Sequence, residues 1–244
     1  MIASKQNILS LQGYAKSYGI QVSDDQALRM LRHLDLLAEA NKLVNLTRIT
    51  EPQDAIIRHI IDSLLLIPSL HAEPLGQKRF VDIGTGGGFP GIPLGIMTEL
   101  DGTLIDSVAK KTRIVSEFLT ELNLDTRLSA EPIRAEDLAR RSPQSYDYVV
   151  ARAVAQLGAL VEYAAPLLKP HGQLVVSKAN ITDEEVSGGI ETAKIVGLKD
   201  VSRETYELPH QNGHREILVF EKVRKSRIKL PRTNGSAVHK PLVS

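Results

Sequence analysis

The chain has 244 residues, of which 42% are hydrophobic and 24% charged, with a formal net charge of +1 at pH 7. This length fits one domain with an appendage, and without a long apolar run or a signal-peptide pattern we expect a cytoplasmic protein without membrane spans. The absence of cysteine excludes disulfides, thiolate metal sites and cysteine nucleophiles, and because the seven histidines are scattered we expect no metal site.

Apolar spacing predicts helices from about residue 5 to residue 70. One stripe follows the helix-start signal Ser23-Asp24-Asp25, and a second follows Pro52, a residue suited to a first helical turn. The two stripes are Leu28, Met30, Leu31, Leu34, Leu36 and Leu37, and then Ile56, Ile57, Ile60, Ile61, Leu64 and Leu65. We therefore expect a helical cap over residues 1–75, with a polar joint at 41–50.

After a segment rich in Pro, Gly and charge at 71–78, short apolar runs alternate with helical stretches. The predicted strands lie at 80–83, 102–105, 127–130, 146–150, 173–177, 199–206 and 215–222, and the predicted helices at 110–122, 156–168 and 184–196. This alternation indicates a mostly parallel sheet with helices on both faces, and the two consecutive late strands indicate an antiparallel edge. We assign residues 76–223 to this core.

A glycine-rich turn over residues 81–91 follows the first predicted strand and precedes a helix. In that context glycines allow the backbone to approach a nucleotide closely. Gly86-x-Gly88-x-x-Gly91 formally satisfies the dinucleotide fingerprint. Asp106 ends the next strand, where a carboxylate can accept both ribose hydroxyls of NAD or of S-adenosylmethionine. Both cofactors remain possible on these residues.

Three features favour S-adenosylmethionine over NAD. Asp82 stands two residues before Gly84 and gives Asp-x-Gly-x-Gly-x-Gly, which resembles class I methyltransferases. In that arrangement the carboxylate can sit near the charged amino acid part of the cofactor. Arg134-Ala135-Glu136 follows the third strand, where methyltransferases commonly place an acidic residue against the adenine amino group. Too few residues follow the turn for the separate catalytic domain of a dehydrogenase. We predict an α/β, Rossmann-like class I methyltransferase fold.

The end of the fourth strand, Val150-Ala151-Arg152, bears on the reaction. It lacks the Asn/Asp-Pro-Pro-Tyr pattern that holds exocyclic amines, and methylation of a pyrimidine ring carbon usually needs a cysteine. The remaining target is an atom with its own lone pair, such as guanine N7. We therefore predict catalysis by orientation and desolvation, with no obligatory general base.

The basic residues are concentrated at the carboxyl terminus, where seven occur without an acid: Lys222, Arg224, Lys225, Arg227, Lys229, Arg232 and Lys240. One interpretation of residues 224–244 is a solvated end, and the other is an arm that contacts RNA phosphates.

Several motifs together resemble the bacterial small-subunit ribosomal RNA guanine-N7 methyltransferase G family, also called glucose-inhibited division protein B. The resemblance extends from about residue 41 to 242. Its motifs are Asn41-x-x-x-Asn45-Leu46-Thr47, Arg58-His59-x-x-Asp62-Ser63-Leu64, residues 82–93 with Phe89-Pro90-Gly91-x-Pro93, Asp106-Ser107-x-x-Lys110-Lys111, Arg134-Ala135-Glu136 and Ala151-Arg152-Ala153. The resemblance implies methylation of one guanine N7 in the decoding region, with 16S rRNA or a ribosomal particle as partner. We expect a monomer.

Carried over by position, the resemblance implies a cofactor site lined by Gly84, Phe89, Ala135, Glu136 and Arg152, with Asp106 on the ribose. Gly86 of the glycine-rich turn completes the predicted cofactor site. Phe89 could instead be a core aromatic, and Arg152 could form a salt bridge with Asp82 or Glu136. The candidate RNA contacts are Asn45, Arg58, Lys178, Arg215, Arg227, Lys229 and Arg232.

Other interpretations remain at this point. His59 and Asp62 could serve helix packing and capping or could form a wall facing the substrate. The chain could also be a small-molecule methyltransferase whose basic tail is incidental, or a non-catalytic RNA-binding protein that retains the fold. Salt-dependent RNA binding argues against the first, and methyl transfer to rRNA argues against the second.

Overall fold

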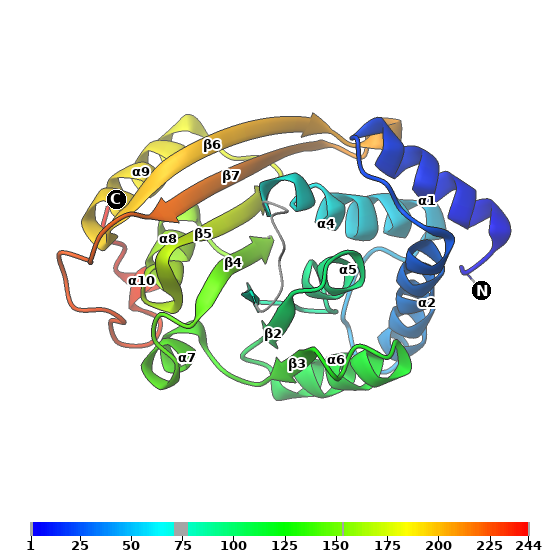
Figure 1. The fold of residues 1–244 in the computed structure, drawn as a ribbon, viewed down its shortest axis with the longest axis horizontal. Helices are drawn as coiled ribbons and strands as arrows, with labels where there is room; N and C mark the ends of the chain where they lie inside the picture. Colours follow the sequence, from blue (N-terminus) through cyan, green and yellow to red (C-terminus); the bar gives the residue numbers. More distant parts are fainter. Residues whose placement is uncertain (1, 71–77, 153, 244) are drawn as a thin grey trace.

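The computed structural model describes residues 2–70, 78–152 and 154–243. The expected boundary between cap and core, at residues 75 and 76, and Ala153 of the strand-end motif lie outside these ranges. Within them, the strands form one sheet in the order β3-β2-β1-β4-β5-β7-β6 (Figure 1). Their bounds are β1 Arg79–Ile83, β2 Asp101–Ile105, β3 Leu128–Glu131, β4 Tyr146–Arg152, β5 Leu168–Lys178, β6 Leu198–Glu207 and β7 His214–Lys222.

Strands β1 to β5 are parallel, and β7 pairs antiparallel with both β5 and β6. The prediction of a mostly parallel sheet with an antiparallel edge is therefore confirmed. Strand β5 begins earlier than expected, at Leu168, because a short pairing with Tyr146 precedes the regular ladder that starts at Gln173.

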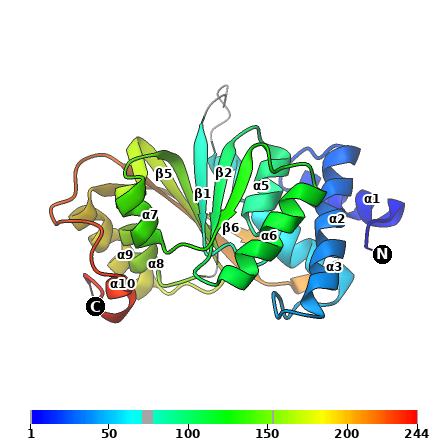
Figure 2. The ribbon, with the colours of Figure 1, turned by 90° about the horizontal axis from the view of Figure 1, so that it is seen from below.

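Helices cover both faces of the sheet (Figure 2). Alternating strand residues point to opposite sides: Phe80 and Val150 belong to the core shared with the cap, whereas Val81 and Val149 belong to the core on the other face. The helices of the core are α5 Gly91–Met97, α6 Ala109–Glu121, α7 Ala135–Arg141, α8 Leu157–Leu167 and α9 Asp183–Val196. Helix α7 was not predicted, because seven residues are too few for a clear apolar period.

The amino-terminal segment is helical, as its apolar stripes predict. Ser23 begins α2 with a capping box, in which its side chain accepts from the Gln26 N–H and the Gln26 side chain accepts from the Ser23 N–H. The buried stripe of α2 excludes Leu28, which is 47% exposed, and includes His33 instead. The elements are α1 Lys5–Ser17, α2 Asp24–Asn41, α3 Pro52–Ala55, the π-helix η1 Ile56–Ile61, α4 Asp62–Leu64 and the 3-10 helix η2 Ile67–Ser69.

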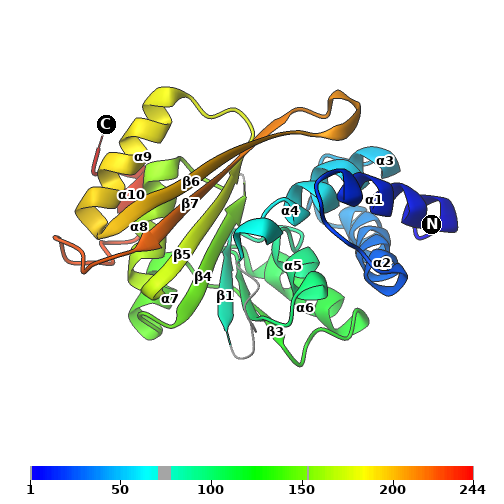
Figure 3. The same ribbon diagram turned by 45° about the horizontal axis from the view of Figure 1, so that its top comes forward.

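A long hairpin connects the sheet to this helical cap. Strands β6 and β7 are joined through the 3-10 helix η3, Pro209–Gln211, and their tip lies beside α1 (Figure 3). The Tyr18 hydroxyl donates to the Glu207 carbonyl at 2.5 Å, and the Tyr14 hydroxyl lies 2.8 Å from His210 Nε2. Hydrogen bonds therefore link the tip of the hairpin to α1 and the residue that follows it.

The residues after β7 are packed rather than extended into solvent. Leu230 and Leu242 contact the core beneath α7, α8 and α9, and the short helix α10 (Ser236–His239) lies near α8. Arg227 is fixed through its backbone, whose N–H donates to the Ile195 carbonyl at the end of α9. In the described ranges, no helix has the length and apolarity needed to cross a membrane.

Candidate active site

The glycine-rich turn lies at the carboxyl ends of β1, β2 and β4. The backbone N–H groups of Gly84 and Thr85 both donate to the Ile105 carbonyl, at 2.8 and 2.9 Å, which fixes the turn to the end of β2. Gly84 has a φ of +74°, and a Cβ there would lie 2.6 Å from a methyl of Val154. The turn therefore requires glycine at this position for conformation and for space.

Two cavities share this turn. One, which we call the β2 cavity, has a volume of about 320 Å³ and is lined by Gly84, Gly86, Asp106, Ala135, Glu136 and Tyr163 among others. The other, the cap cavity, has a volume of about 430 Å³ and lies between the turn and the helical cap. Gly84 and Gly86 line both, so the turn is the wall between them.

Asp106 stands at the end of β2, facing the β2 cavity, as its sequence position predicts. Its Oδ1 accepts the Val108 N–H at 2.9 Å, and its Oδ2 accepts the Gly86 N–H at 3.3 Å. The Lys111 ammonium lies 3.6 Å from Oδ2. These partners orient the carboxylate at the strand end, where hydroxyl donors of a ligand can reach it.

Glu136 and Ala135 begin α7 at the opposite side of the β2 cavity. The Glu136 side chain is buried, and its Oε1 accepts the Gly235 N–H at 2.7 Å. Gly235 belongs to the carboxyl-terminal segment, 99 residues away in the chain. Nothing in the sequence indicated this contact, because neither residue has a local pattern that refers to the other.

Asp82 supports the turn from below and lines neither cavity. It is completely buried, and its Oδ2 accepts the Gly91 N–H at 2.9 Å, which ties the end of β1 to the start of α5. Burial raises the pKa of Asp82 to about 7. The suggestion that this carboxylate sits beside the charged amino acid part of a cofactor therefore stays a prediction.

We expect Asp82→Asn to raise stability relative to the unchanged protein by an amount that grows with pH. The folded-state pKa of about 7 lies above the ordinary value of 3.8, so the folded protein loses stability as pH rises from about 4 to about 7. Asparagine removes that loss, which amounts to at most about 1.4 kcal/mol per pH unit. Urea denaturation of both proteins from pH 5 to pH 8 measures the difference. A difference that stayed constant with pH would contradict this account.

Phe89 lies under the turn and is 5% exposed. Its ring stacks on His33 and on His59, with centroid distances of 4.5 and 4.6 Å. Burial lowers the pKa of His33 to about 4 and that of His59 to about 3, so both imidazoles are neutral at pH 7. His33 was not among the predicted site residues, since a histidine within an apolar helix stripe has no distinctive sequence signal.

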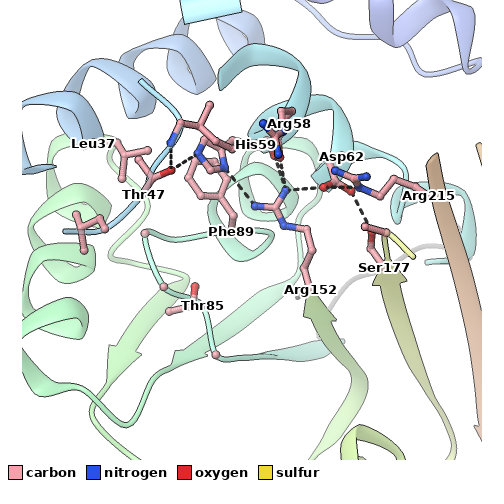
Figure 4. A pocket seen from close by; sticks show the side chains of 16 residues that line it. Leu37, Thr47, Arg58, His59, Asp62, Thr85, Phe89, Arg152, Ser177 and Arg215 are labelled. Atoms are coloured by element: carbon pink, nitrogen blue, oxygen red, sulfur yellow. Dashed lines mark hydrogen bonds and ion pairs between the residues drawn. The ribbon is translucent and has the colours of Figure 1, made fainter. Parts of the chain in front are cut away.

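A buried carboxylate, Asp62, connects the cap to the sheet (Figure 4). Its Oδ2 accepts from Arg152 Nη1 at 3.1 Å and from Arg215 Nε at 2.9 Å. Its Oδ1 accepts from the Ser177 hydroxyl at 2.9 Å. Arg152 therefore forms its salt bridge with Asp62, and not with Asp82 or Glu136, the two partners considered from the sequence. We call Asp62, Arg152, Ser177 and Arg215 the Asp62 cluster.

The guanidinium of Arg152 also binds backbone carbonyls of the cap. Its Nη1 donates to the carbonyls of Arg58 and His59, at 2.8 and 3.3 Å, and its Nη2 lies 3.4 Å from His59 Nδ1. A guanidinium has no acceptor, so His59 Nδ1 is the acceptor and Nε2 carries the proton. His59 Nε2 then donates to Thr47 Oγ1 at 2.9 Å. The polar joint, the helical cap and β4 thus form one connected network.

The structure separates the candidate RNA contacts into three groups. Asn45 and Arg58 are exposed, and Arg58 lines the cap cavity. Lys178, Arg215 and Arg232 are engaged within the protein, by Glu185 at 2.7 Å, Asp62 at 2.9 Å and Glu162 at 2.6 Å respectively.

Arg227 and Lys229, the third group, are exposed and lie near the amino-terminal ends of the parallel strands. Strand β7 runs antiparallel to β5, so its last residue, Lys222, lies at the amino end of the parallel strands. Arg227 follows five residues later, and its backbone N–H donates to the Ile195 carbonyl at the end of α9. Arg227 and Lys229 therefore lie at the end of the sheet opposite the carboxyl ends of the strands, where both cavities are.

The chain is similar to known proteins over most of its length. The family model described as rRNA small subunit methyltransferase G matches residues 26–214. A protein of Desulfitobacterium hafniense named ribosomal RNA small subunit methyltransferase G is 38% identical over 227 residues, covering 92% of each chain. Proteins of the same name from Staphylococcus epidermidis and Deinococcus radiodurans are 37% and 36% identical, covering 92% and 93% of this chain and 94% and 90% of theirs.

Solved structures with much lower sequence identity share the fold. A geranyl diphosphate methyltransferase, solved with its substrate and sinefungin, superposes with a TM-score of 0.52 at 10% identity, covering 67% of this chain and 77% of that one. The cyclase SpnF superposes with a TM-score of 0.57 at 14% identity, covering 82% and 97%. These likenesses show the class I methyltransferase fold.

Proposed function

Because the chain belongs to the rRNA small subunit methyltransferase G family, we propose that its two cavities hold S-adenosylmethionine and a guanine of 16S rRNA on either side of the glycine turn. The protein is an S-adenosylmethionine-dependent enzyme that methylates guanine N7 in this RNA. The observation that carries the placement of the two molecules is the shared wall, since Gly84 and Gly86 line both cavities.

The β2 cavity suits the adenosine part of the cofactor. Asp106 offers a carboxylate to the ribose hydroxyls, and Glu136 offers one to the adenine amino group. At Gly84 the missing Cβ and the positive φ allow the backbone to approach the ligand. When bound, S-adenosylmethionine supplies an electrophilic methyl group on a sulfonium. We assign Gly84, Gly86, Asp106, Ala135 and Glu136 to its binding.

The cap cavity suits the acceptor base. It is lined from the cap by Thr47, Arg58 and His59, and from the core by Phe89 and Arg152. His59 stays neutral at pH 7, and Asp62 compensates one of the three positive charges that Arg58, Arg152 and Arg215 bring to the lining, so the cavity keeps a net positive charge that suits RNA. Arg152 and Phe89 thus shape the wall beside the turn.

Guanine N7 has its own lone pair and attacks the methyl group without losing a proton first. The role of the protein is then to orient the base and to exclude water between the two cavities. We propose that no general base is required. The imidazoles of His33 and His59 are both committed to the hydrogen bonds and stacking that hold Phe89, which fits this mechanism.

The proposed RNA contacts nearest the site are Asn45 and Arg58, because both are exposed and Arg58 stands at the cap cavity. We place the reaction in the cytoplasm, on rRNA or on a ribosomal particle, as family membership suggests. We also propose that a monomer is sufficient, since residues of one chain line both cavities.

The assignment is tested by incubating the protein with labelled S-adenosylmethionine and 16S rRNA or small subunits from cells that lack this activity. We expect label in the RNA and cleavage at a single N7-methylated guanine. Asp106→Ala, whose affinity for the cofactor should be about a hundredfold lower, serves as the control and should transfer much less label at the same cofactor concentration. Absence of label from both RNA and particles would overturn the proposed function.

We expect Arg227→Glu combined with Lys229→Glu to weaken RNA binding at moderate salt and to leave cofactor affinity unchanged. An rRNA is large enough to reach the amino-terminal ends of the parallel strands as well as the cavities. Each phosphate that the protein no longer neutralises makes the slope of log affinity against log salt less steep by about 1. Filter binding at several salt concentrations measures the slope. A slope equal to that of the unchanged protein would remove these two residues from the RNA interface.

A further inference from the structure

The carboxyl-terminal segment reaches the wall of the β2 cavity. The Gly235 N–H donates to Glu136 Oε1 at 2.7 Å, and Glu136 lines that cavity. Among the residues that the structure describes, Gly235 is the hydrogen-bond donor to this carboxylate, which leaves Oε2 for a ligand. One oxygen of the proposed adenine-binding residue is thus held by the end of the chain.

Arg232 anchors this part of the segment to α8. Its Nε and Nη2 donate to Glu162 Oε1 and Oε2, at 2.8 and 2.6 Å. The Glu162 side chain is 5% exposed. A two-bond pair between a guanidinium and a carboxylate fixes distance and orientation together. The sequence position of Arg232 suggested an RNA contact, but the structure uses its guanidinium inside the protein.

Asn234 extends the anchor to α7, the helix that carries Glu136. Its Nδ2 donates to Asp137 Oδ2 at 2.8 Å, and its Oδ1 accepts from Arg140 Nη1 at 2.7 Å. Arg140 Nη2 also donates to the Arg232 carbonyl at 2.8 Å. Gly235 itself has a φ of +80°, a conformation that favours glycine and turns its N–H toward Glu136.

We propose that residues 232–235, which we call the strap, position Glu136 so that its free oxygen accepts the amino group of adenine. Arg232 and Asn234 are then positioning residues, which act on the cofactor through Glu136 without touching it. The inference rests on the proposed function, since it takes the β2 cavity as the adenosine site. It assigns the strap to cofactor selection instead of RNA binding.

The test compares two ligands by calorimetry: S-adenosylhomocysteine, and its analogue in which purine without the 6-amino group replaces adenine. The unchanged protein should prefer the adenine compound by about tenfold or more, because a hydrogen bond to a charged group contributes that much. In Asn234→Ala and Arg232→Ala this preference should fall to within about twofold of unity. Affinity for the purine compound should stay within about twofold of its original value.

Lys240→Ala is the matched control, since Lys240 lies in the same carboxyl-terminal segment, is exposed, and donates its backbone N–H to the Ser236 carbonyl. It should keep the full preference. Arg232→Lys, which retains the charge, should recover part of it. Arg232→Ala could fail to fold, because it leaves the buried Glu162 unpaired. Asn234→Ala then still tests the proposal, because the hydrogen bonds of Asn234 are exposed and their loss leaves the fold intact.

Two results would contradict the proposed role of the strap and leave the proposed function intact. One is an unchanged preference for the adenine compound in Asn234→Ala. The other is an equal loss of affinity for both ligands, which a merely structural role would produce. In both cases the unchanged protein still binds S-adenosylhomocysteine and methylates rRNA. If the unchanged protein binds neither ligand, the proposed function fails instead.

Discussion

Asp106→Ala is expected to lower the affinity for S-adenosylmethionine about a hundredfold while the protein stays folded. The variant loses hydrogen bonding from the ribose to a carboxylate. One such bond contributes about 1.5–3 kcal/mol, and a hundredfold loss, about 2.7 kcal/mol, corresponds to one of them. It also loses the acceptor of the Gly86 N–H, which helps to order the turn. Calorimetric titration with S-adenosylhomocysteine measures the change.

Asp101→Ala is the control for this prediction. Asp101 begins the same strand at its other end and is exposed, so its removal changes the net charge equally without touching the cavity. Its cofactor affinity should match that of the unchanged protein. Equal affinities for Asp106→Ala and Asp101→Ala would rule out Asp106 as the ribose acceptor.

Asp62→Ala should have the largest effect on stability. The substitution leaves Arg152 and Arg215 without their shared carboxylate, and both arginine side chains are only 11% exposed. Removing one partner from a buried ion pair costs about 3–5 kcal/mol, because the remaining charge is desolvated and unpaired. For a protein of this size, that lowers the melting temperature by about 10 °C.

Asp54→Ala, in α3 of the same cap, provides the comparison for Asp62→Ala. Asp54 is only half-buried and lies two helical segments earlier, so its loss should change the free energy of unfolding by less than about 1 kcal/mol. Urea denaturation of the three proteins measures the difference. If Asp62→Ala were as stable as Asp54→Ala, the Asp62 cluster would not hold the cap to the sheet.

The strands, the glycine turn and Asp106 could be predicted because their signals are local. Alternating βα segments fix the sheet, and a carboxylate that ends the second strand must lie at the same edge as the turn after the first. The family motifs add Glu136, Phe89 and Arg152 by position. Of these residues, Asp106 and Glu136 line the β2 cavity, whereas Phe89 and Arg152 line the cap cavity.

What the sequence does not contain is the set of partners that arise when distant elements meet. Arg152 contacts Asp62 across 90 residues, and Glu136 contacts Gly235 across 99. Phe89 is a site residue and a buried aromatic at once, because His33 and His59 from the cap stack on it. Basic residues illustrate the same limit: charge alone cannot distinguish Arg232, which binds Glu162, from the exposed Arg227.

The Asp62 cluster also has a consequence for the order of folding. Asp62 belongs to the first part of the chain to be synthesised, whereas Arg152 and Arg215 follow 90 and 153 residues later. Until those residues emerge from the ribosome, the carboxylate has neither counterion and must remain hydrated, and the cap cannot bury it. Contacts this distant in sequence form slowly, because a long loop must close first. We therefore expect the helices of the cap to reach their final packing only when β7 has added to the sheet.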